Sequence, residues 1–250
     1  VTSNSALNKQ FAFISGVLFL TYPFHNEGIV WLLGRGASMS CGFALAGMLT
    51  MLSNFNLLKR ILLTCSFYFI GLLAYESIIF FPVIILIMAV LRRKSLREKI
   101  LWLFSLLLTL ILHIIARMLI SGSIAGSYGG SFFRSEPVNY LLNIAKTAAR
   151  LILPPTGNMH WLVSAYVVIL LAICMLIVFL IRSLRNKAFM KTLKGLFLCL
   201  CITCITPVFA GVSTITSESD RMLYFPSLFL CMIVSMLITF FMTSSYRKLL

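Results

Sequence analysis

Charged residues are scarce in this chain. Asp, Glu, Lys and Arg make up 11% of its 250 residues, against about 25% in soluble domains, whereas 60% are hydrophobic and the mean hydropathy is +1.03. No polar block is large enough to form a separate soluble core. These absences exclude an ordinary soluble domain. We predict an all-α, polytopic integral membrane protein in which residues 1–250 form a single membrane domain.

Acidic residues are the rarest charged type. The chain has 6 Asp and Glu against 21 Lys and Arg, and Asp220 is its only aspartate. So few carboxylates form no ligand set for a divalent ion, and the chain lacks a paired-histidine metal motif, a phosphate-binding glycine loop and a nucleophile elbow. We therefore predict no metal site and no cofactor, while a requirement for a divalent cation stays open.

The seven cysteines form no recognisable framework. The densest group, Cys199, Cys201 and Cys204, lies inside an apolar run and has no second half elsewhere that would complete a zinc site. Cysteines within apolar runs do not indicate a disulfide scaffold either. We expect these side chains to pack as small apolar groups.

Long apolar runs are what the chain has in abundance. They are about 13 to 22 residues long and recur along its whole length, which is the pattern of transmembrane helices. We predict about eight transmembrane helices, at about 10–24, 28–52, 61–75, 77–91, 100–120, 161–181, 195–212 and 222–243.

The distribution of basic residues orients these helices. Lys and Arg accumulate in short cytoplasmic loops, so we place both termini on the cytoplasmic side, in a bacterial inner (plasma) membrane. Among the acids, only Glu98 falls on the inner side. The basic residues predicted to be inside are Lys9, Lys59, Arg60, Arg92, Arg93, Lys94, Arg97, Lys99, Arg182, Arg185, Lys187, Lys191, Lys194, Arg247 and Lys248.

The net charge of +15 therefore has a topological explanation. Most of it lies in inner loops, where it orients helices and meets anionic lipid headgroups. We expect membrane lipids as partners and no nucleic acid.

One long loop, about 121–160, is predicted on the outer face. Its first part, SGSIAGSYGGSFFRSEP, is rich in Gly and Ser and favours a mobile or ligand-binding segment. Its second part, VNYLLNIAKTAARLILPP, has apolar residues at helical spacing and ends at Pro154 and Pro155. It predicts an amphipathic helix along the outer membrane surface, with an ordinary lid helix as the alternative.

Three polar clusters fall on the same predicted outer face. The first contains His25 and Glu27, with Arg35 about two helical turns farther on. The second is the tight reversal around Glu76, and the third is the stretch SESDRMLYFPS, Ser217 to Ser227. An Arg or Asp at the centre of a span costs about 2.5–3.5 kcal/mol on insertion scales, so such groups normally face a cavity or a partner.

Each of these residues also has a structural interpretation. Arg35, Glu76 and Arg221 can serve as ion pairs between helices, and His25 with Glu27 can be a solvated loop cap. Asp220 can be a solvated helix cap. The pair His113 and Arg117 shares one helix face and either snorkels outward or lines the same cavity.

Three stretches carry a family resemblance. FLTYPFHNEGIVWLLGRGASMSCGFALAGML is followed by LLAYESIIFFPVIIL and, much later, by ESDRMLYFPSLFL. This pattern resembles the polytopic glycosyltransferases of the GT-C superfamily, and is most similar to the transmembrane and tetratricopeptide-repeat O-mannosyltransferases and their bacterial relatives. In that branch an outer loop reads His-Pro-x-His-x-Glu before a Gly-Arg pair, a Lys-Glu pair occupies a later outer turn, and Arg-x-Leu-Tyr-x-Pro-Ser opens a late span. The matching positions here are His25, Glu27, Gly34, Arg35, Glu76, Arg221, Leu223, Tyr224, Pro226 and Ser227.

The chain departs from the family pattern in three places. Tyr75 stands where the family has lysine, and the first histidine before Pro23 is missing. The family also has an aspartate on its first outer loop, whereas this chain has none before Asp220. We expect the two spans that flank that loop to be absent from this chain, which would then lack the catalytic aspartate.

The resemblance implies transfer of a sugar from a polyprenyl-phosphate carrier to a glycan or protein acceptor at the outer face. Arg221 and Arg35 would bind the donor phosphate, which gains negative charge as it leaves. Carboxylates that could accept the acceptor's proton are Glu27, Glu76 and Asp220. His25, Tyr224, His113 and Arg117 are the predicted cavity residues. The alternatives are a transporter or flippase-like protein, and an enzyme of the O-antigen ligase or polymerase type.

Overall fold

The computed structural model describes residues 5–23, 25–30, 34–122, 137–155, 164, 187–213, 216–217 and 220–249, and these residues contain helices and no strand. The loop segment at 123–136 and, apart from residue 164, the predicted span at 161–181 lie outside them. The helical elements are α1 (Ser5–Leu20), α2 (Asn26–Val30), α3 (Arg35–Leu52), α4 (Leu57–Ala74), the 3₁₀ turn η2 (Glu76–Ile78), α5 (Phe81–Leu91), α6 (Leu96–Ser121), α7 (Pro137–Arg150), α9 (Lys187–Thr203), α10 (Ile205–Ala210) and α11 (Asp220–Leu249).

Four described segments are long and apolar enough to cross a membrane, and they are Leu57–Ala74, Leu96–Ser121, Phe189–Ala210 and Asp220–Phe240. A shorter apolar segment covers Glu76–Leu91. These helices support an integral membrane protein of all-α architecture. The predicted total of eight spans is not reached by the described helices and stays a prediction.

Local sequence signals explain where several helices begin and end. The side chains of Asn56 and Ser95 accept hydrogen bonds from backbone N–H groups three residues on, at 2.9 and 3.2 Å, and so cap α4 and α6. Gly122 ends α6 in the left-handed conformation, at φ 69°.

One predicted span is interrupted. The predicted helix 195–212 breaks after Thr203 into α9 and α10. Pro207 explains the break, because proline has no N–H to donate to the carbonyl four residues earlier, which belongs to Thr203. The described residues of the predicted helix 28–52 belong to α2 and α3, and residues 31–33 lie outside the described part.

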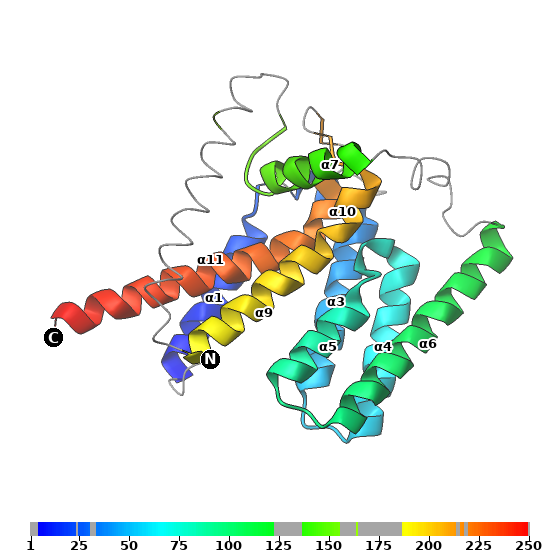
Figure 1. The fold of residues 1–250 in the computed structure, drawn as a ribbon, viewed down its shortest axis with the longest axis horizontal. Coiled ribbons are helices and arrows are strands. Elements are labelled where there is room, and N and C mark those ends of the chain that lie inside the picture. The colour runs from blue at the N-terminus through cyan, green and yellow to red at the C-terminus, as the bar shows by residue number, and fades with distance from the viewer. Residues whose placement is uncertain are drawn as a thin grey trace.

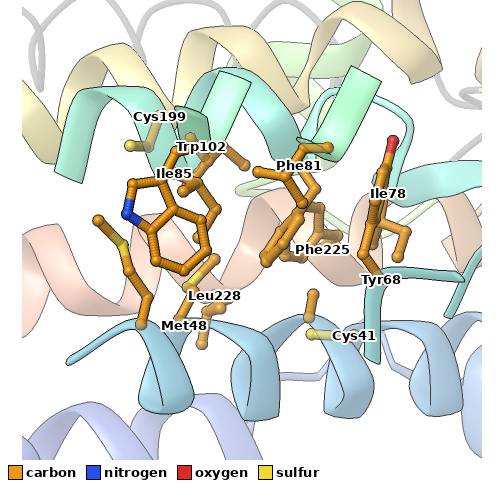
Figure 2. Packing of buried hydrophobic residues seen from close by; sticks show 14 of the residues in the cluster. Cys41, Met48, Tyr68, Ile78, Phe81, Ile85, Trp102, Cys199, Phe225 and Leu228 are labelled. Atoms are coloured by element: carbon orange, nitrogen blue, oxygen red, sulfur yellow. The ribbon is translucent and has the colours of Figure 1, made fainter. Parts of the chain in front are cut away.

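A buried core joins α3, α4, α5, α6, α9 and α11. Trp102, Tyr68, Phe81 and Phe225 are fully buried in it. The rings of Tyr68 and Phe81 stack with centroids 5.2 Å apart, and Figure 2 shows Phe81 beside Phe225, with Trp102 extending between Ile85 and Met48. Of the three cysteines predicted to pack as apolar groups, Cys199 belongs to this core, Cys204 is half-buried and Cys201 is exposed. Cys41 belongs to the core as well.

The two ends of the bundle differ in their connections (Figure 1). The α3–α4 and α5–α6 loops lie together at one end, where Glu98 pairs with Arg60 at 3.4 Å and with Lys94 at 3.0 Å. The helix α7 lies across the opposite end, against α10 and the start of α11. The loops predicted to be cytoplasmic thus occupy one end, and the predicted outer helix occupies the other.

Helix α7 confirms the predicted helix at the second part of the loop. Its Asn143 side chain donates to the Val208 carbonyl at 3.0 Å, and the rings of Tyr140 and Phe209 lie 5.1 Å apart, so α7 is attached to α10. Large apolar side chains nevertheless remain exposed on α7, namely Val138, Leu141, Leu142 and Ile144.

The start of α3 packs closely on the end of α4. A Cβ atom at Gly36 would lie 2.6 Å from the Ala74 carbonyl oxygen, a backbone atom that cannot move aside without shifting α4. Gly42, on the same helix, has no heavy atom within 4 Å of the equivalent position. Glycine is therefore required by packing at position 36 and not at position 42.

We predict that Gly36→Ala lowers the free energy of unfolding by about 1–3 kcal/mol, the range expected for overpacking. Gly42→Ala, the matched control, should leave it unchanged or raise it, since alanine favours a helix more than glycine does. Unfolding in detergent micelles, followed by circular dichroism, measures both. Equal stability of the two variants would contradict the close approach of α3 and α4.

Candidate functional site

The start of α11 is held by a carboxylate from α2. Glu27 accepts a hydrogen bond at its Oε2 from the backbone N–H of Arg221, at 2.9 Å, and its Oε1 lies 3.7 Å from the Arg221 Nε. A carboxylate at a helix N-terminus satisfies N–H groups that have no partner within the helix and complements the helix dipole. Glu27 is buried, so it acts as a cap and an ion-pair partner and is not a solvated loop cap.

The neighbouring residue, Asp220, forms a second ion pair. Its carboxylate accepts a hydrogen bond from Arg150 at the end of α7, and the two residues are 3% and 1% exposed. Arg150 also donates to the Leu153 carbonyl at 2.6 Å, and the Tyr22 hydroxyl donates to the Leu151 carbonyl at 2.6 Å. The solvated-cap interpretation of Asp220 is therefore wrong, because the only aspartate of the chain is buried against an arginine.

His25 lies in an aromatic cage next to these pairs. Its Nε2 is 2.8 Å from the Ser227 hydroxyl oxygen, and its ring stacks on Tyr224 with centroids 3.9 Å apart. The rings of Phe19 and Tyr22 approach to 4.8 Å each. Burial in this cage lowers the pKa of His25 to about 4, so the imidazole is neutral at pH 7. The solvated-cap interpretation fails for His25 as well.

The middle motif reaches the same site through Tyr75. The guanidinium carbon of Arg221 lies 5.9 Å from the centre of the Tyr75 ring, which is cation–π distance. The Tyr75 carbonyl accepts a hydrogen bond from Ser40 of α3 at 2.8 Å. Tyrosine thus contacts Arg221 from the position where the family pattern has lysine.

Two other predicted residues form a pair at the edge of the site. Glu76 forms an ion pair with Arg117 of α6, and the Glu76 side chain remains 45% exposed. His113, one turn earlier on α6, is buried, and its ring lies 6.3 Å from that of Phe69 on α4. Since α6 packs on α4 and α5, His113 is not brought to the cage around His25.

Of the two arginines predicted to bind the donor phosphate, Arg35 is the exposed one. Its Nε donates to the Ile29 carbonyl at 3.2 Å, and within the described part of the chain its side chain forms no ion pair. The structural ion pair that we considered for Arg35 is therefore not seen among the described residues, whereas those of Glu76 and Arg221 are.

The three carboxylates of the site differ in their burial and in their partners. Burial raises the pKa of Glu27, and the Arg221 N–H and guanidinium oppose this shift. Asp220 is committed to Arg150, and Glu76 is partly open to solvent. No group of three His, Cys, Asp or Glu in the described residues is placed to hold a metal ion.

Sequence reasoning found most of these residues and missed Arg150, Tyr22 and Phe19. Phe19 and Tyr22 lie in the first stretch of the family resemblance, but neither is a matching position of its motif. Arg150 had one available signal, because it ends the predicted helix of the outer loop and Asp220, the only aspartate, needs a cation if it is buried. Glu218 of the opening cluster lies outside the described residues.

Comparison with known proteins identifies no relative. No family model matches the chain, and no curated protein or solved structure matches it either.

The two ion pairs should differ strongly in their contribution to stability. Asp220→Asn leaves Arg150 charged and buried, and we predict a loss of about 3–5 kcal/mol in the free energy of unfolding. Glu76→Gln removes a half-exposed carboxylate, and the loss should stay below about 1 kcal/mol. Unfolding in detergent micelles measures both, and equal losses would contradict the burial of the Asp220 pair.

The lowered pKa of His25 determines whether the stability of the protein rises or falls with pH. Between about pH 4 and the ordinary pKa of 6.5, the unfolded chain binds a proton at this side chain and the folded protein does not. The contribution of His25 is therefore complete above pH 6.5 and is lost as the pH falls toward 4, by an amount on the order of 3 kcal/mol. Glu27 acts in the opposite direction, because its raised pKa makes stability decline as the pH rises above 4.5.

We predict that His25→Gln flattens the decline of the melting temperature between pH 6.5 and 4. Glutamine places an amide N–H near the Ser227 hydroxyl and does not titrate. Thermal unfolding of both proteins across this range is the measurement, and an unchanged decline in the variant would show that His25 titrates normally.

Proposed function

We propose that the protein is a membrane glycosyltransferase that moves a sugar from a polyprenyl-phosphate donor to a glycan or protein acceptor at the outer face of the membrane. One observation carries the proposal. Residues of the first and third motifs, separated by as many as 202 positions, meet around the start of α11, where His25 contacts Ser227 and Glu27 contacts Arg221. The second stretch contributes Tyr75, the residue before its matching position Glu76, which lies against Arg221. The motifs were identified from their resemblance to the GT-C pattern, without reference to spatial position.

The two arginines suit different parts of a phosphate site. Arg35 is exposed, so its guanidinium is available to a phosphate without breaking an ion pair. Arg221 is fixed between the Glu27 carboxylate and the Tyr75 ring. An arginine has five N–H donors, so Arg221 keeps donors for a phosphate oxygen while it remains oriented by Glu27. In this proposal Arg35 attracts the donor and Arg221 stabilises the leaving phosphate.

The carboxylates that could accept the proton of the acceptor are all engaged in ion pairs. The family pattern implies an aspartate, and Asp220 is occupied by Arg150. Glu76 is paired too, with Arg117, but its side chain is 45% exposed and thus remains open to an acceptor, whereas Glu27 serves to position Arg221. Within this chain we therefore assign Glu76 to the acceptor side of the cavity and Glu27 to the donor side.

The apolar surroundings suit a lipid-linked donor. The start of α11 belongs to a segment long enough to cross a membrane, and α7 presents exposed apolar side chains at the same end of the bundle. A polyprenyl tail can lie along such helices while its phosphate reaches the arginines at the membrane boundary.

The test is a comparison of cell-surface glycans from cells with and without the intact gene, followed by complementation. We predict that Arg221→Ala and Arg35→Ala reduce glycan transfer at least tenfold at normal protein level, because each removes a charge-assisted contact to the donor phosphate. Lys59→Gln, an exposed cation at the opposite end, is the matched control and should complement fully.

The location of the unused donor distinguishes a transferase from a transporter. If the protein transfers the sugar, cells without it accumulate lipid-linked donor on the outer face of the membrane, where an impermeant labelling reagent reaches it. Accumulation on the inner face would instead show a flippase and would overturn the proposal. Full complementation by both arginine variants would also overturn it.

A further inference from the structure

The end of the bundle opposite the candidate site carries a group of exposed cations. They come from three places in the chain: the α5–α6 loop, the first turn of α6, and the first half of α9. We call this group the basic surface, and it consists of Arg92, Arg93, Arg97, Lys191 and Lys194.

Packing between α5 and α9 brings these segments together. The Lys191 Nζ donates to the Leu91 carbonyl at 3.0 Å, next to Arg92 in the chain. At Gly195 a Cβ atom would lie 2.6 Å from a Leu91 methyl carbon, so the backbone of α9 passes close to the end of α5. The basic surface is therefore a feature of the fold as well as of the sequence.

Acidic residues nearby do not neutralise the basic surface. Among the described residues, the one acid at this end is Glu98, and it pairs with Arg60 and Lys94. None of the five cations of the basic surface forms an ion pair with a described residue. Arg92 and Arg93 thus lie beside the start of α9 with its two lysines, and Arg97 follows them in the first turn of α6. This concentration of positive charge at one end of the bundle favours the binding of an anion.

Arg93 adds a second, independent observation. It has a φ of 54°, the only positive φ of a described non-glycine residue, and it ends α5 in a Schellman turn. In this turn the Arg93 N–H donates to the Val90 carbonyl and the Lys94 N–H to the Ala89 carbonyl, both at 3.0 Å. Glycine is the residue that the backbone favours there, so the arginine is present at the expense of local stability.

The helix faces that lead away from the cations indicate which anion binds. On α9, Lys191 and Lys194 are followed on the same face by exposed Leu198. On α6, Arg97 is followed by exposed Ile100, Leu101 and Phe104. Cations at a helix end with exposed apolar side chains beyond them match a phospholipid, whose headgroup is charged and whose chains are apolar. A nucleic acid would leave these apolar side chains without a partner.

We propose that the basic surface is a binding site for an anionic phospholipid, with the headgroup phosphate on Arg92, Arg93, Arg97, Lys191 and Lys194 and the acyl chains along α6 and α9. The site lies at the end of the bundle away from the His25 cage and is independent of the proposed transferase activity.

The test is lipid binding to the purified chain in a non-ionic detergent. Dioleoyl phosphatidylglycerol and dioleoyl phosphatidylcholine are titrated separately, and native mass spectrometry gives the bound fraction. The anionic lipid should bind at least tenfold more tightly, and Arg97→Gln should weaken it about fivefold, the effect of one cation at a lipid surface. Lys146→Gln on α7 removes an equal charge at the opposite end and should leave binding unchanged.

Arg93→Gly separates binding from folding. Without the anionic lipid, this variant should melt about 2–4 °C higher than the original chain, since glycine relieves the left-handed backbone. Its affinity for phosphatidylglycerol should nevertheless fall about fivefold. A variant damaged in folding would lose both stability and binding, so the opposite signs identify a binding role.

Three results would overturn the proposal. Equal binding of the two lipids would show that the headgroup charge is not recognised. Equal weakening by Arg97→Gln and Lys146→Gln would show that only total charge matters. Displacement of phosphatidylglycerol by a 20-base-pair DNA duplex at 150 mM salt, with tighter binding of the duplex, would assign the basic surface to nucleic acid.

Discussion

The start of α11 depends on two adjacent charges of opposite sign, the buried Asp220 and the half-buried Arg221. Asp220 pairs with Arg150 and Arg221 with Glu27, so the four charges sum to zero within a small apolar region. An isolated charge in such a place is strongly destabilising, whereas a closed, neutral group with hydrogen bonds to backbone atoms is tolerated. The partners come from α2 and α7, which are far apart in the sequence. Removing one member of the Asp220–Arg150 pair would leave the other as a buried charge without a partner.

This arrangement divides the polar residues at the α7 end of the bundle into two kinds. Glu27 and Asp220 are committed to arginines, and His25 is neutral within its aromatic cage. Arg35 and Glu76 keep solvent contact. A structural role of the ion pairs is therefore compatible with a catalytic role of the site. The pairs orient Arg221, and the exposed side chains of Arg35 and Glu76 remain accessible to a ligand.

The sequence was sufficient to predict most helices, because apolar runs report burial or membrane contact directly. It did not predict the break after Thr203, since the importance of Pro207 depends on whether neighbouring helices compensate for the lost hydrogen bond. At the site, the shared outer placement of Glu27 and Arg221 followed from topology, and their pairing did not, because topology gives a side of the membrane and no distance. Arg150 was missed for the same reason: its helix was predicted to lie on a surface, while its last residue is buried.

The exposed apolar side of α7 has a mechanical consequence. The apolar side chains on that side are exposed in the described bundle, and α7 is attached to α11 through its final residue, Arg150. Any displacement of α7 that moves Arg150 would therefore act directly on the carboxylate of Asp220. Because Arg221 is the next residue along the chain, such a displacement would also change the backbone that positions its guanidinium.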